Sequence, residues 1–480
     1  MGVKRFYSTK DNTITNAFKA GLTIRGTGSN MGESDILEVY SIYGQASSAS
    51  SEKSRILIDF PILTTIAQSR DSGELPTSGT DNLSFYLRLY NAEHSQTLPK
   101  QFTLVVAQAS SSWNEGTGLD MDEFSDSGYS NWVYRSSSAP WVDEGGDILS
   151  GSADTTGSQL FELGTEDLLI NVTPIVEDWL SGDSSSNGFA VFLTSSQETA
   201  TESYYTKKFF ARNSEFHMKR PCLEARWNSS RGDDSETFYK SSSLAPAADN
   251  LNTLYLYNKI RGQLVDIPSV AQGEILVSVH EAVGTPALPL PVGGGVVTDA
   301  DTNVTGSWAS TGIYEATFAM SHSISSFVPV WKTNTEEFHT GSSITVNSFD
   351  SQDYYPDKEY IFKIKNLKKS YSEDEKMRLR LFVRHKNWCP TNYTVSNTTA
   401  SNEILEDVFW KVERVVDKFD IIDYGTGSTQ HTLLSYDSEG NYFDFDTSIL
   451  EKGYQYAFKF IYNIAGEYHE AKNEFRFRVE

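Results

Sequence analysis

The feature that most restricts how this chain can fold is the repeated alternation of apolar and polar residues in short runs. Residues 474–479, for example, read Glu, Phe, Arg, Phe, Arg, Val. A two-residue period places every second side chain on one face of an extended strand. Similar short runs are found at 56–60, 83–90, 102–106, 188–193, 274–279, 314–318, 360–364 and 378–383. The chain is therefore predicted to be all-β.

One segment, residues 172–180, instead has the period of a helix. Thr173 is placed to be its N-cap, Pro174 occupies the first helical position, and Gly182 follows as a stop signal. Its apolar face is formed by Ile175, Val176, Trp179 and Leu180. We expect this face to lie on a sheet, with Trp179 in the core.

The chain has 480 residues, enough for several domains. Polar, turn-rich stretches near 228–236 and 348–357 mark two breaks. The predicted organisation is an N-terminal arm (1–14), a large β-sandwich (15–228), a protease-sensitive linker (229–250) and two smaller sandwiches (251–350 and 351–480). The last two are each close to the size of an immunoglobulin-like domain.

Charge narrows the choice of partners. The 64 acidic residues exceed the 40 basic ones by 24, and this excess repels nucleic acids and anionic membranes. The sequence has no signal-peptide-like start and no run of about 18 apolar residues, so we expect synthesis in the cytoplasm and no membrane anchor. Cys222 and Cys389 lie far apart, without the spacing of a disulfide framework or a zinc site.

Catalytic motifs are missing from the sequence. The eight histidines are scattered, and no nucleophile elbow, phosphate-binding loop or dinucleotide-binding element occurs. The prediction is that the protein is not an enzyme and needs no cofactor. A glycoside hydrolase remains an alternative, because two carboxylates can be brought together by the fold alone.

An acidic stretch offers the one candidate for a metal ligand. Asp120, Asp122 and Asp126 place several hard oxygen ligands close together, as a structural calcium ion requires. The stretch lacks the glycine and the final glutamate of an EF-hand loop. The competing interpretation is a solvated acidic loop.

Three tryptophans in a loop-rich region form a second candidate site. Trp113, Trp132 and Trp141 could stack against sugar rings if they are exposed. The alternative is that they fill the core and the end loops of the sandwich, because aromatic side chains dominate core burial.

Residues of the first domain follow, in order, a known family pattern. Its elements are found at 30–39, 54–60, 83–91, 113–116, 131–146, 170–182, 187–191, 209–213 and 220–224. In this order they resemble the DNRLRE domain, a jelly-roll β-sandwich similar to carbohydrate-binding modules. The resemblance implies that Trp179 packs on a sheet and that Asn187 and Gly188 form a turn. A serine-rich insert at 46–53 and the acidic loop at 119–128 depart from the pattern.

The arrangement of the whole chain resembles virion structural proteins of tailed marine phages. It implies a non-catalytic component of a tail, neck, baseplate, fibre or capsid, made in the host cytoplasm and located in the virion. Its partners would be other virion proteins and copies of itself. The alternative is a carbohydrate-binding adhesin that recognises host-surface glycans, and a further alternative is a polysaccharide-degrading enzyme.

Overall fold

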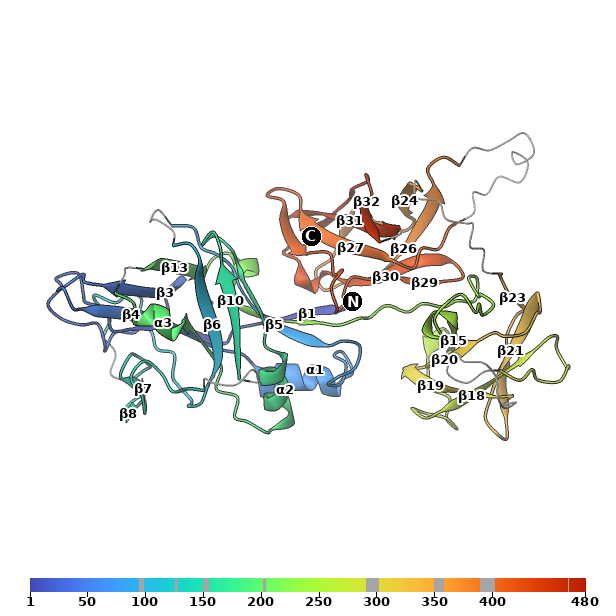
Figure 1. Ribbon diagram of the computed structural model, residues 1–480, viewed down its shortest axis with the longest axis horizontal. Coiled ribbons are helices and arrows are strands. Elements are labelled where there is room, and N and C mark those ends of the chain that lie inside the picture. The colour runs from blue at the N-terminus through green and yellow to red at the C-terminus, as the bar shows by residue number, and fades with distance from the viewer. Residues whose placement is uncertain are drawn as a thin grey trace. The chain divides into compact units, whose positions relative to one another are not determined.

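The computed structural model describes residues 1–94, 99–125, 128–149, 155–201, 204–290, 302–348, 358–388, 402–464 and 466–480. Strands predominate throughout, and helices are few and short (Figure 1). The chain divides into two compact units, of which the first contains residues 1–228 with the short segments 426–431 and 449–451. The second unit contains the remaining residues from 229 to 480. The all-β prediction is confirmed.

Two sheets build the first domain. The smaller sheet contains, in order, β1 (Val3–Tyr7), β14 (Cys222–Arg226), β5 (Ser84–Leu89) and β11 (Leu168–Asn171). The larger contains β10 (Thr156–Phe161), β6 (Phe102–Ala109), β12 (Phe189–Leu193), β4 (Ser51–Asp59), β3 (Ile36–Tyr43) and β13 (Tyr204–Phe210), with β2 (Lys10–Thr15) on β4 and β9 (Ile148–Leu149) on β6. A separate hairpin joins β7 (Tyr134–Ser136) to β8 (Ala139–Pro140). Alternate residues of both sheets meet in one core, which includes Phe6, Leu87, Ile56 and Val191.

The N-terminal segment is part of this sandwich, so the prediction of a separate arm at 1–14 is wrong. Strand β1 pairs with β14 and strand β2 pairs with β4, both antiparallel. Val3 and Phe6 are both buried, and Phe6 belongs to the core between the two sheets.

Helix α2 (Thr173–Ser181) packs against β5 and the short helical turn η1 (Ile62–Ile66). Trp179 is buried and its ring lies 4.7 Å from that of Phe189, as expected for a core residue. Thr173 does not cap the helix: its hydroxyl accepts a hydrogen bond from Phe85 N at 2.8 Å, which ties the helix to β5. Gly182 ends the helix in a left-handed conformation.

In the described part of the chain, two further α-helices are single turns, α1 (Ala67–Asp71) and α3 (Ser195–Glu198). Short 3₁₀ turns lie at His217–Lys219, Ala248–Asn250 and Thr447–Ile449. No helix among the described residues is long and apolar enough to cross a membrane.

A seven-stranded sheet forms the second domain. Its order is β15 (Leu251–Tyr257), β20 (Ile313–Ala319), β19 (Val304–Ser310), β18 (Ile275–His280), β21 (Ser326–Lys332) and β22 (Glu337–Thr340), with β23 (Ile344–Thr345) on β21. A small hairpin joins β16 (Lys259–Ile260) to β17 (Gln263–Leu264). The first half of β19 pairs with β18 and its second half with β20, so the sheet turns at this strand and encloses the core.

Two facing sheets form the third domain. One contains β24 (Tyr360–Ile364), β26 (Lys376–His385), β30 (Gly440–Asp446) and β29 (Ser435–Asp437). The other contains β25 (Ser370–Tyr371), β33 (Phe475–Val479), β31 (Gln455–Ile464), β27 (Val408–Arg414) and β28 (Phe419–Ile422), with β32 (Glu467–Glu470) on β31. Aromatic rings join the sheets, as in the stacked pair Phe362 and Phe460, whose centroids are 5.8 Å apart. This is a β-sandwich with an aromatic core.

Candidate functional site

The segment 229–250, which the sequence predicts to be a free linker, is built into the second unit. We call it the connector. Its Phe238 is buried in the core of the second domain, 4.7 Å from the ring of Phe327. Asn347 N donates to Phe238 O at 2.8 Å, and Lys240 N donates to Asn347 O at 2.9 Å. Polar groups of the connector form hydrogen bonds within the second unit instead of facing solvent. The prediction of a free linker fails for this reason.

The start of the connector also pairs with strand β29 of the third domain. Tyr436 N donates to Arg231 O at 2.9 Å, and Asp233 N donates to Tyr436 O at 3.0 Å. Between them Gly232 lies against the tyrosine ring, and a Cβ atom at this position would be 2.6 Å from that ring. Only glycine allows this close approach.

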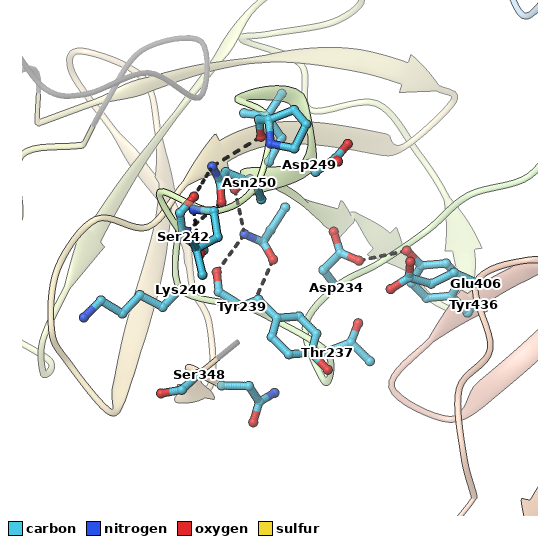
Figure 2. A pocket seen from close by; sticks show the side chains of 16 residues that line it. Asp234, Thr237, Tyr239, Lys240, Ser242, Asp249, Asn250, Ser348, Glu406 and Tyr436 are labelled. Carbon is cyan, nitrogen blue, oxygen red and sulfur yellow. Dashed lines mark hydrogen bonds between the residues drawn. The ribbon is translucent and has the colours of Figure 1, made fainter. Parts of the chain in front are cut away.

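Asp234 joins the connector to both smaller domains. Its Oδ1 accepts a hydrogen bond from the Tyr436 hydroxyl at 2.8 Å, and its Oδ2 accepts one from Thr253 N at 2.6 Å. Asp234 N donates in turn to Thr253 O at 2.9 Å. The aspartate therefore binds the backbone edge of β15 as a neighbouring strand would. Its other oxygen binds Tyr436 of β29, as Figure 2 shows.

A polar pocket of about 780 Å³ lies beside Asp234. Figure 2 shows the labelled side chains of its lining, including Asp234, Tyr239, Lys240, Asn250, Glu406 and Tyr436. Two asparagines shape its wall. Asn252 bonds both backbone groups of Tyr239, at 2.9 and 3.0 Å, and Asn250 does the same for Ser242, at 2.8 and 3.1 Å.

The surroundings of the pocket raise the pKa values of its carboxyl and phenol groups. Burial raises the pKa of the Asp234 carboxyl above its usual value. Loss of solvation, followed by repulsion from Asp234 and Asp407, raises the pKa of Glu406. Burial, followed by the negative charges of Asp234 and Glu406, also raises the pKa of Tyr436, so its hydroxyl stays protonated and donates.

These groups can recognise a neutral polar ligand. The pocket offers carboxyl and amide acceptors, a lysine ammonium group, and the ring of Tyr239, which is 45% exposed. Within the described ranges, no three His, Cys, Asp or Glu side chains are grouped as a metal ion would need. The arrangement suits hydrogen bonding to hydroxyl groups, with a tyrosine ring at the side of the pocket.

The structure buries the three tryptophans of the first domain. Trp113, Trp132 and Trp141 are 2%, 5% and 5% exposed and belong to one apolar cluster. Two of their indole groups donate to backbone oxygens, from Trp113 to Asn187 at 3.0 Å and from Trp141 to Asn131 at 2.8 Å. This burial favours the interpretation of these residues as core residues over that of an exposed sugar-binding platform.

Two of the three acidic candidates for calcium have hydrogen bonds within the protein. Asp120 Oδ1 accepts from Glu123 N, and Asp122 Oδ1 accepts from Ala20 N, both at 2.8 Å. Asp126 lies outside the described residues. The carboxylates of Asp120 and Asp122 thus accept hydrogen bonds from the backbone N–H groups of Glu123 and Ala20, which favours a structural role for them.

Asn187 and Gly188 form the turn that leads into β12. Asn187 Nδ2 donates to Ser110 O at 3.0 Å. Gly188 has a φ of +85°, and a Cβ atom there would be 2.3 Å from Ile58 O. Both positions are therefore architectural, as the sequence indicates.

Sequence reasoning missed the connector pocket. The sequence features that could have pointed to it are the Asp233–Asp234 pair and Tyr436, which are about 200 positions apart in the chain. No local pattern links them, because only the parallel pairing of the connector with β29 brings them together.

Comparison with known proteins gives structural matches only. No protein-family model matches the chain, and no curated protein matches it in sequence. One similar solved structure is the N-terminal Ig1-2 module of the Drosophila receptor protein tyrosine phosphatase DLAR, with 7% identity, a TM-score of 0.14, and coverage of 48% of this chain and 91% of that one. Another is the Yersinia pseudotuberculosis adhesin InvE, with 10% identity, a TM-score of 0.14, and coverage of 49% and 61%.

Proposed function

We propose that this protein is a non-enzymatic structural component of a phage particle, in which serial β-domains act as a scaffold for assembly. The observation that supports this role is the connector, which is hydrogen-bonded to β15 of the second domain and to β29 of the third. Such a joint resists bending, because moving the two domains apart breaks backbone pairing and the Asp234 bonds together. A particle component needs this stiffness and a large surface more than it needs chemistry.

Its partners in this role are other virion proteins and further copies of the chain. The net charge of −24 favours basic surfaces on these neighbours. Sheet edges such as β22 and β28 provide backbone groups for pairing with them.

The direct test is an inventory of purified particles by mass spectrometry, followed by cryo-EM of the same particles. We expect the chain to be a stoichiometric component, and particles formed without it to be incomplete. Intact, infectious particles from a deletion strain, together with release of reducing sugars from a polysaccharide by the isolated chain, would establish the enzyme alternative instead.

A sharper test uses the connector. Tyr436→Phe removes only the hydroxyl that donates to Asp234, and we expect it to lower incorporation into particles. Tyr468→Phe is the matched control, because Tyr468 is exposed on β32. Equal incorporation of the two variants would show that stiffness at the connector is not required.

A second function, binding of host-surface glycans, is favoured by the connector pocket. Its polar lining and the exposed ring of Tyr239 offer what a sugar needs, namely hydrogen-bonding groups and an apolar face. A glycan array probed with the intact chain tests this function. Binding that Tyr239→Ala abolishes and Tyr468→Ala retains would support an adhesin, and an array without any signal would refute it.

A further inference from the structure

Lys207 is a lysine in the interior of the first domain. It lies on β13 and is 1% exposed. Its Nζ is 5.1 Å from the ring centroid of Phe161 and 5.0 Å from that of Phe209. Lysine is rarely buried this fully, since removing its charge from water is costly.

The side-chain amide of Asn91 lies next to this amine. Lys207 Nζ is 2.6 Å from Asn91 Oδ1, and it also contacts Gly164 O at 3.0 Å and Glu166 O at 2.8 Å. Asn91 follows the end of β5 and forms an isolated bridge with Phe209, two residues from Lys207. The backbone therefore fixes the amine and the amide on the same side of neighbouring segments.

The surroundings meet the chemical needs of a reaction between these two groups. An amine attacks a carboxamide only in its neutral form, and burial lowers the pKa of Lys207 to about 8, against the opposing effect of the Asp167 and Glu166 carboxylates. Asp167 Oδ1 accepts a hydrogen bond from the backbone N of Asn91 at 2.7 Å, and the Asp167 charge acts on Lys207, so we assign the proton relay to this carboxylate. Fixed geometry replaces the collision that such a reaction otherwise requires.

We propose that Lys207 and Asn91 become joined by an intramolecular isopeptide bond. The lone pair of Lys207 Nζ attacks Asn91 Cγ and forms a C–N bond. The tetrahedral intermediate collapses with cleavage of the Cγ–Nδ2 bond, and Nδ2 leaves as ammonia after it takes up a proton that Nζ gives up through Asp167. No oxidant, reductant or cofactor is consumed.

The bond would close a covalent loop from the end of β5 to β13. It would also fix the turn at 162–167, whose Gly164 and Glu166 carbonyls contact the same lysine. A cross-link of this kind keeps a domain from opening under load, because the chain between residues 91 and 207 can no longer extend. The inference stands independently of the proposed function, although it suits a load-bearing component.

Intact-mass spectrometry of the full chain tests the proposal. We expect the wild-type mass to be lower than the sequence mass by one ammonia, and a protease digest to contain a branched peptide that links Lys207 to Asn91. Lys207→Arg and Asn91→Ala should each restore the full mass. Lys208→Arg is the matched control, because Lys208 pairs with Glu38 and should leave the loss unchanged.

The peptide map of the wild-type chain keeps the test decisive even if a variant fails to fold. Two results overturn the proposal: a wild-type mass equal to the sequence mass, and an ammonia loss that maps to another residue, such as Asn187. Mass spectrometry of freshly synthesised chain over time adds a kinetic readout, since Asp167→Ala should slow the appearance of the ammonia loss. An unchanged rate in this variant would remove Asp167 from the proposed proton relay.

Discussion

Asp11 illustrates how a single buried residue makes stability depend on pH. Its carboxyl lies inside the first domain on β2, where Oδ2 accepts a hydrogen bond from Arg212 N at 2.6 Å. Burial raises the pKa of Asp11 to about 7. The folded state therefore holds a proton that the unfolded state has already released at the same pH.

We expect the first domain to lose stability as the pH rises from about 4 to about 7. The sign follows from the raised pKa of Asp11. Below the pKa of the unfolded state, the carboxyl is protonated in both states. As the pH rises from there through the pKa of the folded state, the unfolded state releases its proton first, so the folded state loses stability. Asp11→Asn should remove this pH dependence and stabilise the domain above pH 7, by up to about 4 kcal/mol. Hydrogen exchange of first-domain amides at several pH values measures the effect. Parallel pH curves for the two proteins would contradict it.

Trp179 is the residue on which the α2 interface depends most. Trp179→Ala should destabilise the first domain by about 3–5 kcal/mol, because it removes a large buried ring that packs on Phe189. Leu163→Ala is the control, since this leucine is exposed and its loss should cost little. Denaturant melts of the three proteins, followed by hydrogen exchange of the α2 amides, give the comparison. Equal midpoints would place Trp179 on an exposed face.

At the scale of elements, strands β1, β5 and β14 share one buried ion network. Glu224 on β14 contacts Arg5 Nε at 2.6 Å, Arg226 Nη2 at 2.6 Å and Arg88 Nη1 at 3.3 Å. Burial alone would raise the pKa of Glu224, but the three guanidinium groups hold it well below its usual value. One carboxylate thus contacts three cations.

Glu224→Gln should destabilise the first domain by about 3–5 kcal/mol, since it removes the negative charge that three buried or half-buried guanidinium groups share. Asp417→Asn, at an aspartate that is 41% exposed and pairs with Arg414, should cost less than about 1 kcal/mol. Urea denaturation of the intact chain with both variants tests this difference. A small effect of Glu224→Gln would mean that solvent reaches the network.

The connector behaves as two elements with different exposure. Residues 231–240 are paired on both sides, whereas Leu244 is 81% exposed and residues 243–249 contain few buried groups. Limited proteolysis with a broad-specificity protease should therefore cut within 243–249 and spare 231–240. Phe238→Ala, which removes the buried ring, should extend cleavage into 231–240. Initial cleavage at 231–240 in the wild type would contradict the observed pairing.

For the whole molecule, the net charge of −24 is the property that acts at long range. If the partners are basic particle surfaces, association should slow steeply with salt, because the screening length falls from about 10 Å at 0.1 M to about 3 Å at 1 M. Binding of the chain to particles that lack it, followed by surface plasmon resonance at several salt concentrations, measures the on-rate. A rate that does not change with salt would indicate apolar docking instead.

The sequence alone determined the class of structure, because strand formation depends on local alternation that can be read residue by residue. It also located helix α2 and placed Trp179 in the core, since both follow from a single helical face. Its two candidate interpretations for Trp113, Trp132 and Trp141 could not be separated, as burial depends on what packs from elsewhere in the chain.

The tertiary structure decided everything that rests on pairing between distant residues. It placed residues 3–15 in the sandwich, built the connector into the second unit, and brought Asp234 to Tyr436 and Lys207 to Asn91. Each of these contacts joins segments separated by tens to hundreds of residues. Local composition cannot encode them, because the register of long-range strand pairing is set by the summed burial of whole sheets rather than by any one segment.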